Sequence, residues 1–127
     1  MILRTKIAFL ILATISLSAC GVSGVPEKIV EDYLAAVAAG DDIRAINLSC
    51  TEWEGRARID ADSFMNVETM IEEMNCAIIA RTQSTVDVQC SGYVVADYQG
   101  KDKEIDLSLQ AYRLISENGV WRVCGNP

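Results

Sequence analysis

The sequence contains no histidine, and its basic residues are few. Without histidine, one copy of the chain cannot assemble a Ser-His-Asp or Cys-His nucleophilic site, and a metal site would lack one of the usual zinc ligands. The 11 Lys and Arg residues stand against 18 Asp and Glu residues. Because nucleic-acid binding depends on Lys and Arg side chains that neutralise phosphates, we do not expect a nucleic acid as partner.

An apolar run long enough to cross a membrane is also missing. Residues 7–15, IAFLILATI, are almost entirely apolar, but Ser16 and Ser18 end the run soon afterwards, whereas a spanning helix needs about 20 apolar residues. Arg4 and Lys6 precede the run, and small residues follow it. This order of charged, apolar and small residues is typical of an export signal, so we predict a signal peptide over residues 1–19.

The signal ends in Leu17-Ser18-Ala19-Cys20, which resembles the lipobox of bacterial lipoproteins. In that family the cysteine thiol carries a diacylglycerol, the signal is cut just before it, and the new amino terminus is usually acylated, for example with palmitate. The resemblance implies that Cys20 is the lipid-attachment residue and that a lipid anchor holds the protein in the bacterial cell envelope. The alternatives are a plain signal peptide with an incidental cysteine and a short uncleaved anchor.

The residue after the cysteine bears on which membrane would hold the anchor. Gly21 stands where Gram-negative lipoproteins retained at the inner membrane have aspartate. By that resemblance, the protein faces the periplasm from the outer membrane if its source is Gram-negative.

Behind the signal we expect a short tether and one domain. Residues 20–25 form the lipidated tether, in which Gly21-Val22-Ser23-Gly24 is typical of a flexible linker, and residues 26–127 suffice for a single modest core. Without Arg4 and Lys6, 9 basic residues remain against 18 acidic ones, a net charge of −9. Such a domain is repelled by anionic lipid, so we expect membrane contact through the lipid alone.

Four further cysteines, Cys50, Cys76, Cys90 and Cys124, follow the predicted anchor. An exported protein meets an oxidising compartment, where an even number of cysteines favours two disulfides. A metal site is the competing interpretation, but it favours closely spaced pairs or histidines, and the gaps here are 26, 14 and 34 residues. We therefore predict two disulfides, with no metal and no cofactor.

The first half of the domain has the apolar spacing of helices. One helix is predicted over residues 26–40, PEKIVEDYLAAVAAG, with Pro26 in its first turn and Gly40 at its C-terminal cap. Asp41 or Asp42 can cap a second helix, whose inward face would carry Ile43, Ile46 and Cys50. A third helix is predicted to begin at residues 60–63, with this apolar stripe: Phe64, Val67, Met70, Ile71 and Met74.

After Asn75 the pattern changes to that of antiparallel strands. A hairpin turning at residues 82–84 places these residues opposite one another: Ile78 and Val88, Ala80 and Val86, and Cys76 and Cys90. The other face is mostly polar, as in a half-buried sheet. This register favours the disulfide Cys76–Cys90 and leaves Cys50 to join Cys124.

Two further hairpins complete the predicted sheet. One turns at residues 98–101, between strands over residues 92–97 and 104–115. The other turns at Asn118-Gly119, because both central positions of a type I′ turn need positive φ, and it leads into a last strand over residues 120–124. The predicted fold class is α+β, with N-terminal helices packed on a curved antiparallel sheet.

Two segments, PEKIVEDYLAAVAAGD at the start and YRLISENGVWRVCG near the end, give residues 26–125 a resemblance to the NTF2-like (cystatin-like) superfamily. Within that superfamily the chain resembles the small bacterial lipoproteins of largely unknown function. The resemblance implies a strongly curved sheet around the long first helix, forming a cone that can hold a pocket. Related folds include isomerases, cyclases and dehydratases that use a pocket Asp, Tyr or His as acid or base.

Candidate acid and base residues are few in this sequence. A Tyr and Asp pair can serve as hydrogen-bond donor and base, and the candidates are Tyr33, Tyr112 and Asp97. Tyr33 lies on the apolar stripe of the first helix, which favours a core position, and Asp97 adjoins a turn, which favours solvent. We therefore predict no catalytic residues and no enzyme activity.

Other motifs have simple structural interpretations. Residues 60–63, DADS, begin like a calcium loop, but Met65 occupies the position where an EF-hand needs glycine, so helix capping explains them better. The acidic residues Glu68, Glu72 and Glu73 are expected on the solvated face of the third helix. Trp121 is expected in the core or a pocket wall, as is Trp53, for which exposure is the alternative.

Two functions follow as hypotheses. The first is a non-catalytic envelope lipoprotein that engages an envelope protein partner or a second copy of itself. The second is a small-molecule binder that uses an apolar pocket of the cone.

Overall fold

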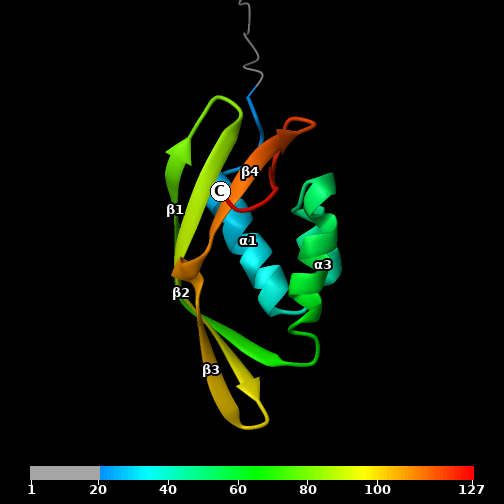
Figure 1. Cartoon of the computed structure of the whole chain (residues 1–127), viewed down its shortest axis with the longest axis vertical. Coiled ribbons are helices and arrows are strands. Elements are labelled where there is room, and N and C mark those ends of the chain that lie inside the picture. Colours follow the sequence, from blue (N-terminus) through cyan, green and yellow to red (C-terminus); the bar gives the residue numbers. More distant parts are fainter. Residues whose placement is uncertain (1–20) are drawn as a thin grey trace, which may run out of the picture.

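The computed structural model describes residues 21–127, which form three α-helices followed by a curled antiparallel sheet (Figure 1). The predicted α+β class is confirmed, and the helices lie on one side of the sheet as the cone requires. Cys20 and the predicted signal peptide lie outside the described residues. Among the helices of residues 21–127, none is long and apolar enough to span a bilayer.

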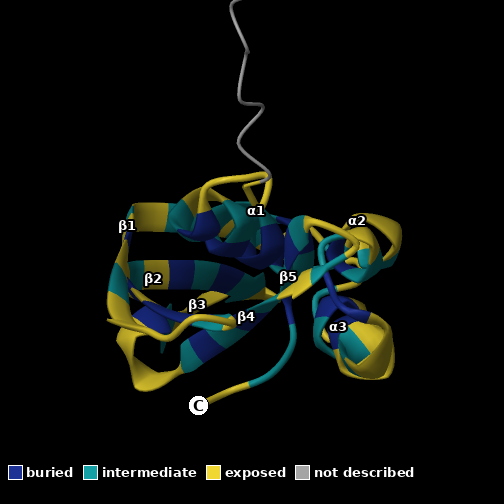
Figure 2. Ribbon diagram, turned by 90° about the horizontal axis from the view of Figure 1, so that it is seen from above, coloured by how far each residue is buried: buried dark blue, intermediate teal, exposed yellow. Residues whose placement is uncertain are grey.

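Helix α1, Pro26–Ala38, is the predicted first helix. Pro26 occupies its first turn, where a missing N–H costs nothing. Gly40 follows its end with φ +67°, and the Gly40 N–H donates to the Val37 carbonyl. The face that carries Val30, Tyr33 and Leu34 is buried, so α1 lies against the sheet and forms the centre of the core (Figure 2).

Helix α2, Asp42–Asn47, begins where expected, because the Asp41 side chain accepts a hydrogen bond from the Arg44 N–H. The prediction that Ile43 lies on the inward face of this helix is wrong, because Ile43 is 69% exposed. The helix has only six residues and buries Ala45 instead. Cys50 is buried, but on extended backbone beyond the helix.

The predicted third helix is wrong in position. A 3-10 turn, η1 (Thr51–Trp53), leads into helix α3, Glu54–Asp62, which ends where the predicted helix was to begin. Residues 68–81 form strand β1 instead. The error has a physical cause: Glu73 has φ 54° at a β-bulge, and the extra residue separates the inward Ile71 and Met74 by three positions, as in a helix. Glu68, Glu72 and Glu73 are exposed as expected, but on this strand.

The sheet has five strands in the order β1-β2-β4-β5, and β3 pairs with the far half of β2. Their bounds are β1 Glu68–Arg81, β2 Thr85–Tyr98, β3 Lys101–Asp106, β4 Ala111–Glu117 and β5 Val120–Val123. The strand predicted over residues 104–115 is two strands, because the 3-10 turn η2, Leu107–Leu109, interrupts it. The Asp106 carboxylate accepts the Ser108 N–H and fixes this turn. The first half of β2 therefore pairs with β4 and the second half with β3.

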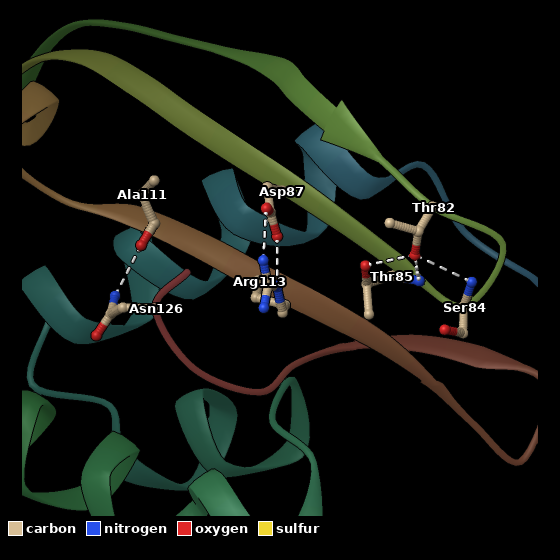
Figure 3. Close-up of polar contacts among 7 residues, drawn as sticks. All are labelled: Thr82, Ser84, Thr85, Asp87, Ala111, Arg113 and Asn126. Carbon is tan, nitrogen blue, oxygen red and sulfur yellow. Dashed lines mark hydrogen bonds and ion pairs between the residues drawn. The ribbon is translucent and has the colours of Figure 1, made fainter.

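The β1–β2 register agrees with the prediction at Cys76 opposite Cys90 and at Ile78 opposite Val88. It differs beyond them, because a second irregularity after Ile78 places Ala80 opposite Asp87 rather than Val86. Asp87 itself is buried although it lies on the polar face. Arg113 on β4 accounts for this burial, since its guanidinium bonds both carboxylate oxygens (Figure 3).

Two disulfides stabilise this arrangement. Cys76 is bonded to Cys90 across the β1–β2 hairpin, and Cys50 to Cys124, across 74 residues of chain. This is the pairing that the hairpin register favours. The second bond ties the end of the sheet to the loop after α2.

A glycine lies where the bulge of β1 meets β2. Gly92 on β2 has φ +102°, and a Cβ there would lie 2.6 Å from the carbonyl oxygens of Glu72 and Glu73. The bulge of β1 thus presses directly on the backbone of β2, which only glycine tolerates. Asn118 and Gly119 have φ 53° and 76°, which confirms the predicted type I′ turn between β4 and β5.

Candidate functional site

A cavity of about 190 Å³ lies between the C-terminal ends of α1 and α3 and the β2–β3 part of the sheet. Its walls are mainly apolar: Leu34, Val37, Phe64, Val94, Ile105 and Leu107. It exists because the long strand β2 bends away from β4 to pair with β3, while the helices bridge the concave side. The cone therefore contains a hollow, as the NTF2-like resemblance implies.

One polar side of the cavity is built on Asp60 of α3. The Arg56 Nε donates to Asp60 Oδ1 at 2.8 Å, and the Tyr33 hydroxyl donates to Asp60 Oδ2 at 3.4 Å. The Trp53 indole N–H donates in turn to the Tyr33 hydroxyl at 3.1 Å. Three elements, α1, η1 and α3, thus hold the Asp60 carboxylate in place, and among residues 21–127 its Oδ2 has one long partner, the Tyr33 hydroxyl.

Tyr112 of β4 forms the adjoining wall. Its hydroxyl donates to Gln110 Oε1 at 3.2 Å, and its ring lies against that of Tyr33, with centroids 5.6 Å apart. Burial raises the pKa of Tyr112 to about 12 and raises the pKa of Tyr33 above its ordinary range. Both phenols therefore stay protonated at physiological pH and act as hydrogen-bonding groups.

The lining carries acidic but no basic side chains. Asp60 and Asp106 are its charged members. The hydroxyl and the backbone N–H of Ser108 both donate to Asp106 Oδ1 and lower the pKa of that carboxyl. The Ser63 hydroxyl donates to the Ile59 carbonyl. Both charged groups of the lining are therefore hydrogen-bond acceptors.

The structure brings together two of the three residues singled out as acid or base candidates. Tyr112 lines the cavity, and Tyr33, which is buried as predicted, lies behind it against the Tyr112 ring and Asp60. Asp97 lies apart, at the β2–β3 turn, where its Oδ1 accepts the Gly100 N–H. The carboxylate beside the tyrosines is Asp60, which sequence reasoning had assigned to helix capping.

The capping role of residues 60–63 is wrong, because Asp60 and Asp62 lie in the last turn of α3 rather than before a helix. A signal for Asp60 did exist: Arg56 precedes it by four residues, the spacing of an ion pair on one helix face. Within the described part of the chain, no three potential ligands gather to hold a metal ion. Trp121 is buried, and Trp53 is half-buried over Tyr33.

No protein-family model matches the sequence, and no match was found among curated proteins. Solved structures are similar in fold. A SEC-C motif containing protein from Rhodopseudomonas palustris superposes with TM-score 0.56 at 14% identity, covering 80% of this chain and 77% of that one. A protein of unknown function from Mycobacterium tuberculosis superposes with TM-score 0.51 at 12% identity, covering 79% of this chain and 68% of that one. An NTF2-like family protein from Streptomyces avermitilis superposes with TM-score 0.48 at 14% identity, covering 78% of this chain and 93% of that one. At these identities the first two likenesses show the fold alone.

Proposed function

We propose that this protein is an exported, lipid-anchored binding protein whose cavity takes a small, mainly apolar molecule with a hydrogen-bond donor. The observation that carries the proposal is the cavity between α1, α3 and β3, with apolar walls and the Asp60 carboxylate at one side. Binding without catalysis is part of the proposal. A protein partner or a second copy of the chain stays a prediction.

The size of the cavity limits the ligand. Drug-sized molecules occupy pockets of about 300–1,000 Å³, and an apolar cavity of about 150 Å³ holds one benzene molecule. The 190 Å³ here therefore suit a molecule with a single ring or a short branched chain.

The charge of the cavity limits the ligand's polar group. A carboxylate ligand would approach Asp60 and Asp106, and the guanidinium beside them, that of Arg56, is outside the lining and already paired with Asp60 Oδ1. An amine or a hydroxyl can donate to Asp60 Oδ2, whose partner in the described part of the chain, the Tyr33 hydroxyl, is 3.4 Å away. We therefore expect selection for donors against anions.

A matched series of ring compounds tests this function. Benzylamine, benzyl alcohol and benzoate share one ring and differ in the polar group. At ten times its Kd, a ligand stabilises the folded state by about 1.4 kcal/mol, which raises the melting midpoint by roughly 6 °C for a domain of this size. We expect that rise with the amine and the alcohol but not with benzoate.

Variants locate the effect. Asp60→Asn should abolish the difference in thermal shift between benzylamine and benzoate. Asp97→Asn, the same change at the distant β2–β3 turn, should leave that difference intact. Equal shifts with benzoate, or no shift with any of the three compounds, would contradict the proposal.

The lipid anchor is supported by the lipobox-like tetrad ending at Cys20 and by two disulfides, which persist in oxidising compartments outside the cytosol. Mass spectrometry of the protein purified from membranes tests it. The mature chain should begin at Cys20 and carry the added mass of its acyl chains. A chain that retains residues 1–19, with an unmodified thiol, would refute the anchor.

A further inference from the structure

We propose that the domain stands on the membrane in one fixed orientation, with the end formed by the β1–β2 and β4–β5 turns against the bilayer and the cavity facing away from it. The inference rests on the lipid anchor at Cys20 proposed above. The surface that contacts this end of the molecule is the lipid bilayer that holds the anchor.

The first argument is that the tether is bonded to the sheet. Ser23 pairs with Val120 as a short parallel bridge. The Ser23 N–H donates to the Gly119 carbonyl at 2.8 Å, and the Trp121 N–H donates to the Ser23 carbonyl at 3.3 Å. The segment predicted to be a flexible linker is thus attached to the edge of β5, next to the β4–β5 turn.

The second argument is chain length. Cys20 precedes Ser23 by three residues, and consecutive Cα atoms are 3.8 Å apart, so its Cα can lie at most about 11 Å from that of Ser23. An acyl group on Cys20 would enter the bilayer close to Gly119. The part of the sheet around this turn therefore has to lie at the membrane surface.

The β1–β2 turn lies at the same end of the sheet. Thr85, which follows that turn, pairs with Ile115, two residues before the end of β4, and Figure 1 shows both turns beside the segment that enters the domain at residue 21. The Thr82 hydroxyl holds the β1–β2 turn closed through its contacts with Ser84 and Thr85 (Figure 3). Two compact turns and the tether thus form one end of the molecule.

The two ends differ in charge. The membrane-facing turns, residues 82–84 and 118–119, are uncharged. Glu117 beside them accepts hydrogen bonds from the Thr51 N–H and hydroxyl, and Arg81 and Arg122 lie nearby in the register.

At the opposite end, Glu68 faces Asp97, and Asp97 faces Asp102, across three neighbouring strands. With Glu104, four carboxylates lie there against the two ammonium groups of Lys101 and Lys103, so this end is acidic on balance. Surface potentials decay within about 8 Å at physiological ionic strength, so the anionic bilayer repels only charges that lie close to it. The uncharged turns can approach the lipid, whereas the acidic end would be repelled.

This orientation places the cavity far from the lipid. Val94 lines the cavity and follows Thr85 by nine residues in β2, which corresponds to about 30 Å along the strand. The cavity therefore lies on the part of the sheet that is remote from the bilayer surface. Its ligand would arrive from solution rather than from the bilayer that holds the anchor.

Energy transfer from the protein to the lipid surface tests the orientation. The full chain, expressed with its signal and purified in lipidated form, would be labelled with a donor dye at Gln83→Cys or at Gln99→Cys and placed in phosphatidylcholine vesicles that contain an acceptor lipid. Both residues are exposed turn residues of one type, at opposite ends of β2. Transfer should be severalfold higher from position 83.

A third protein provides the control. A Gly-Ser repeat inserted between Gly21 and Val22 keeps the lipid but removes the length limit, so transfer from the two positions should become similar. Similar transfer with the native tether, or higher transfer from position 99, would overturn the orientation. Mass spectrometry of the same samples separates the two proposals, because an unlipidated Cys20 refutes the anchor and the orientation together, whereas a lipidated Cys20 with equal transfer refutes the orientation alone.

Discussion

Arg113 and Asp87 face each other across strands β4 and β2, and the guanidinium donates two hydrogen bonds, at 2.8 and 2.9 Å, to the two carboxylate oxygens. Bidentate pairs of this kind are the strongest charge-assisted contacts. The pair sits on the outer face of the sheet, where Asp87 is buried and Arg113 covers it. It allows a carboxylate to lie at the junction of the three longest strands.

The Arg113 hydrogen bonds lower the pKa of Asp87, which predicts a pH-dependent contribution to stability. Because the folded pKa is depressed, the contribution is complete above the unfolded value of about 3.9 and is lost as the pH falls through the folded pKa. The variant Arg113→Met should be less stable than the native protein at pH 7, and the difference should shrink below pH 4. Urea unfolding of both proteins at pH 7, 5, 3 and 2 measures this. A difference that stays constant to pH 2 would contradict it.

The two disulfides should contribute unequally to stability. In the loop-entropy model, the Cys76–Cys90 bond contributes about 3 kcal/mol and the Cys50–Cys124 bond about 4.5 kcal/mol, because the second closes a much longer loop. The double variant Cys50→Ala with Cys124→Ala should therefore unfold at a lower urea concentration than Cys76→Ala with Cys90→Ala. The reverse order would show that local strain or packing, rather than loop length, sets the contributions.

Gly92 should be the least replaceable glycine of the sheet. In Gly92→Ala the Cβ would lie 2.6 Å from two carbonyl oxygens at a φ of +102°, so we expect a loss beyond the strain of about 1–3 kcal/mol that an unfavourable backbone conformation costs. Gly100→Ala is the matched control, because its φ is +84° but a Cβ there meets nothing within 4 Å. Thermal unfolding should rank the two, and an equal loss would mean that the contact with the β1 bulge is unimportant.

The Tyr33 hydroxyl connects Trp53 to Asp60. Tyr33→Phe keeps the buried ring but leaves the Trp53 indole N–H and the Asp60 carboxylate with one partner fewer, which should cost about 1–2 kcal/mol. Denaturant unfolding measures the loss, and the emission of Trp53 should change in the folded state. Tyr98→Phe, at an exposed residue, is the control and should change stability little. A neutral Tyr33→Phe would show that these hydrogen bonds exchange freely with water.

Local sequence rules predicted the conformation correctly wherever residues close together in the chain determine it. Pro26 and Gly40 mark the limits of α1, Asp41 begins α2, and Asn118-Gly119 sets the last hairpin. The predicted register of the β1–β2 hairpin is correct at Cys76–Cys90 and Ile78–Val88, but it is wrong next to the turn, where Ala80 lies opposite Asp87. In each correct case a cap, a positive φ or a two-residue alternation is encoded within a few positions.

Those rules failed where a distant segment changes the local pattern. The bulge at Glu73 exists because Gly92, nineteen residues later, lets β1 press against β2, and it gave the strand a helical spacing. The prediction of the candidate site was incomplete for the same reason. Tyr33 and Tyr112 could be named from the sequence, but only the packing of α1 against α3 and β4 brings them to Asp60.

By itself, then, the sequence determined the fold class, the first helix and two of the turns, because these depend on contacts between near neighbours in the chain. The tertiary structure alone decided the bend of the sheet, the cavity with its acidic side, and the attachment of Ser23 to the edge of β5. These features arise between segments tens of residues apart, and their geometry is set by how the helices fill the concave face of the sheet.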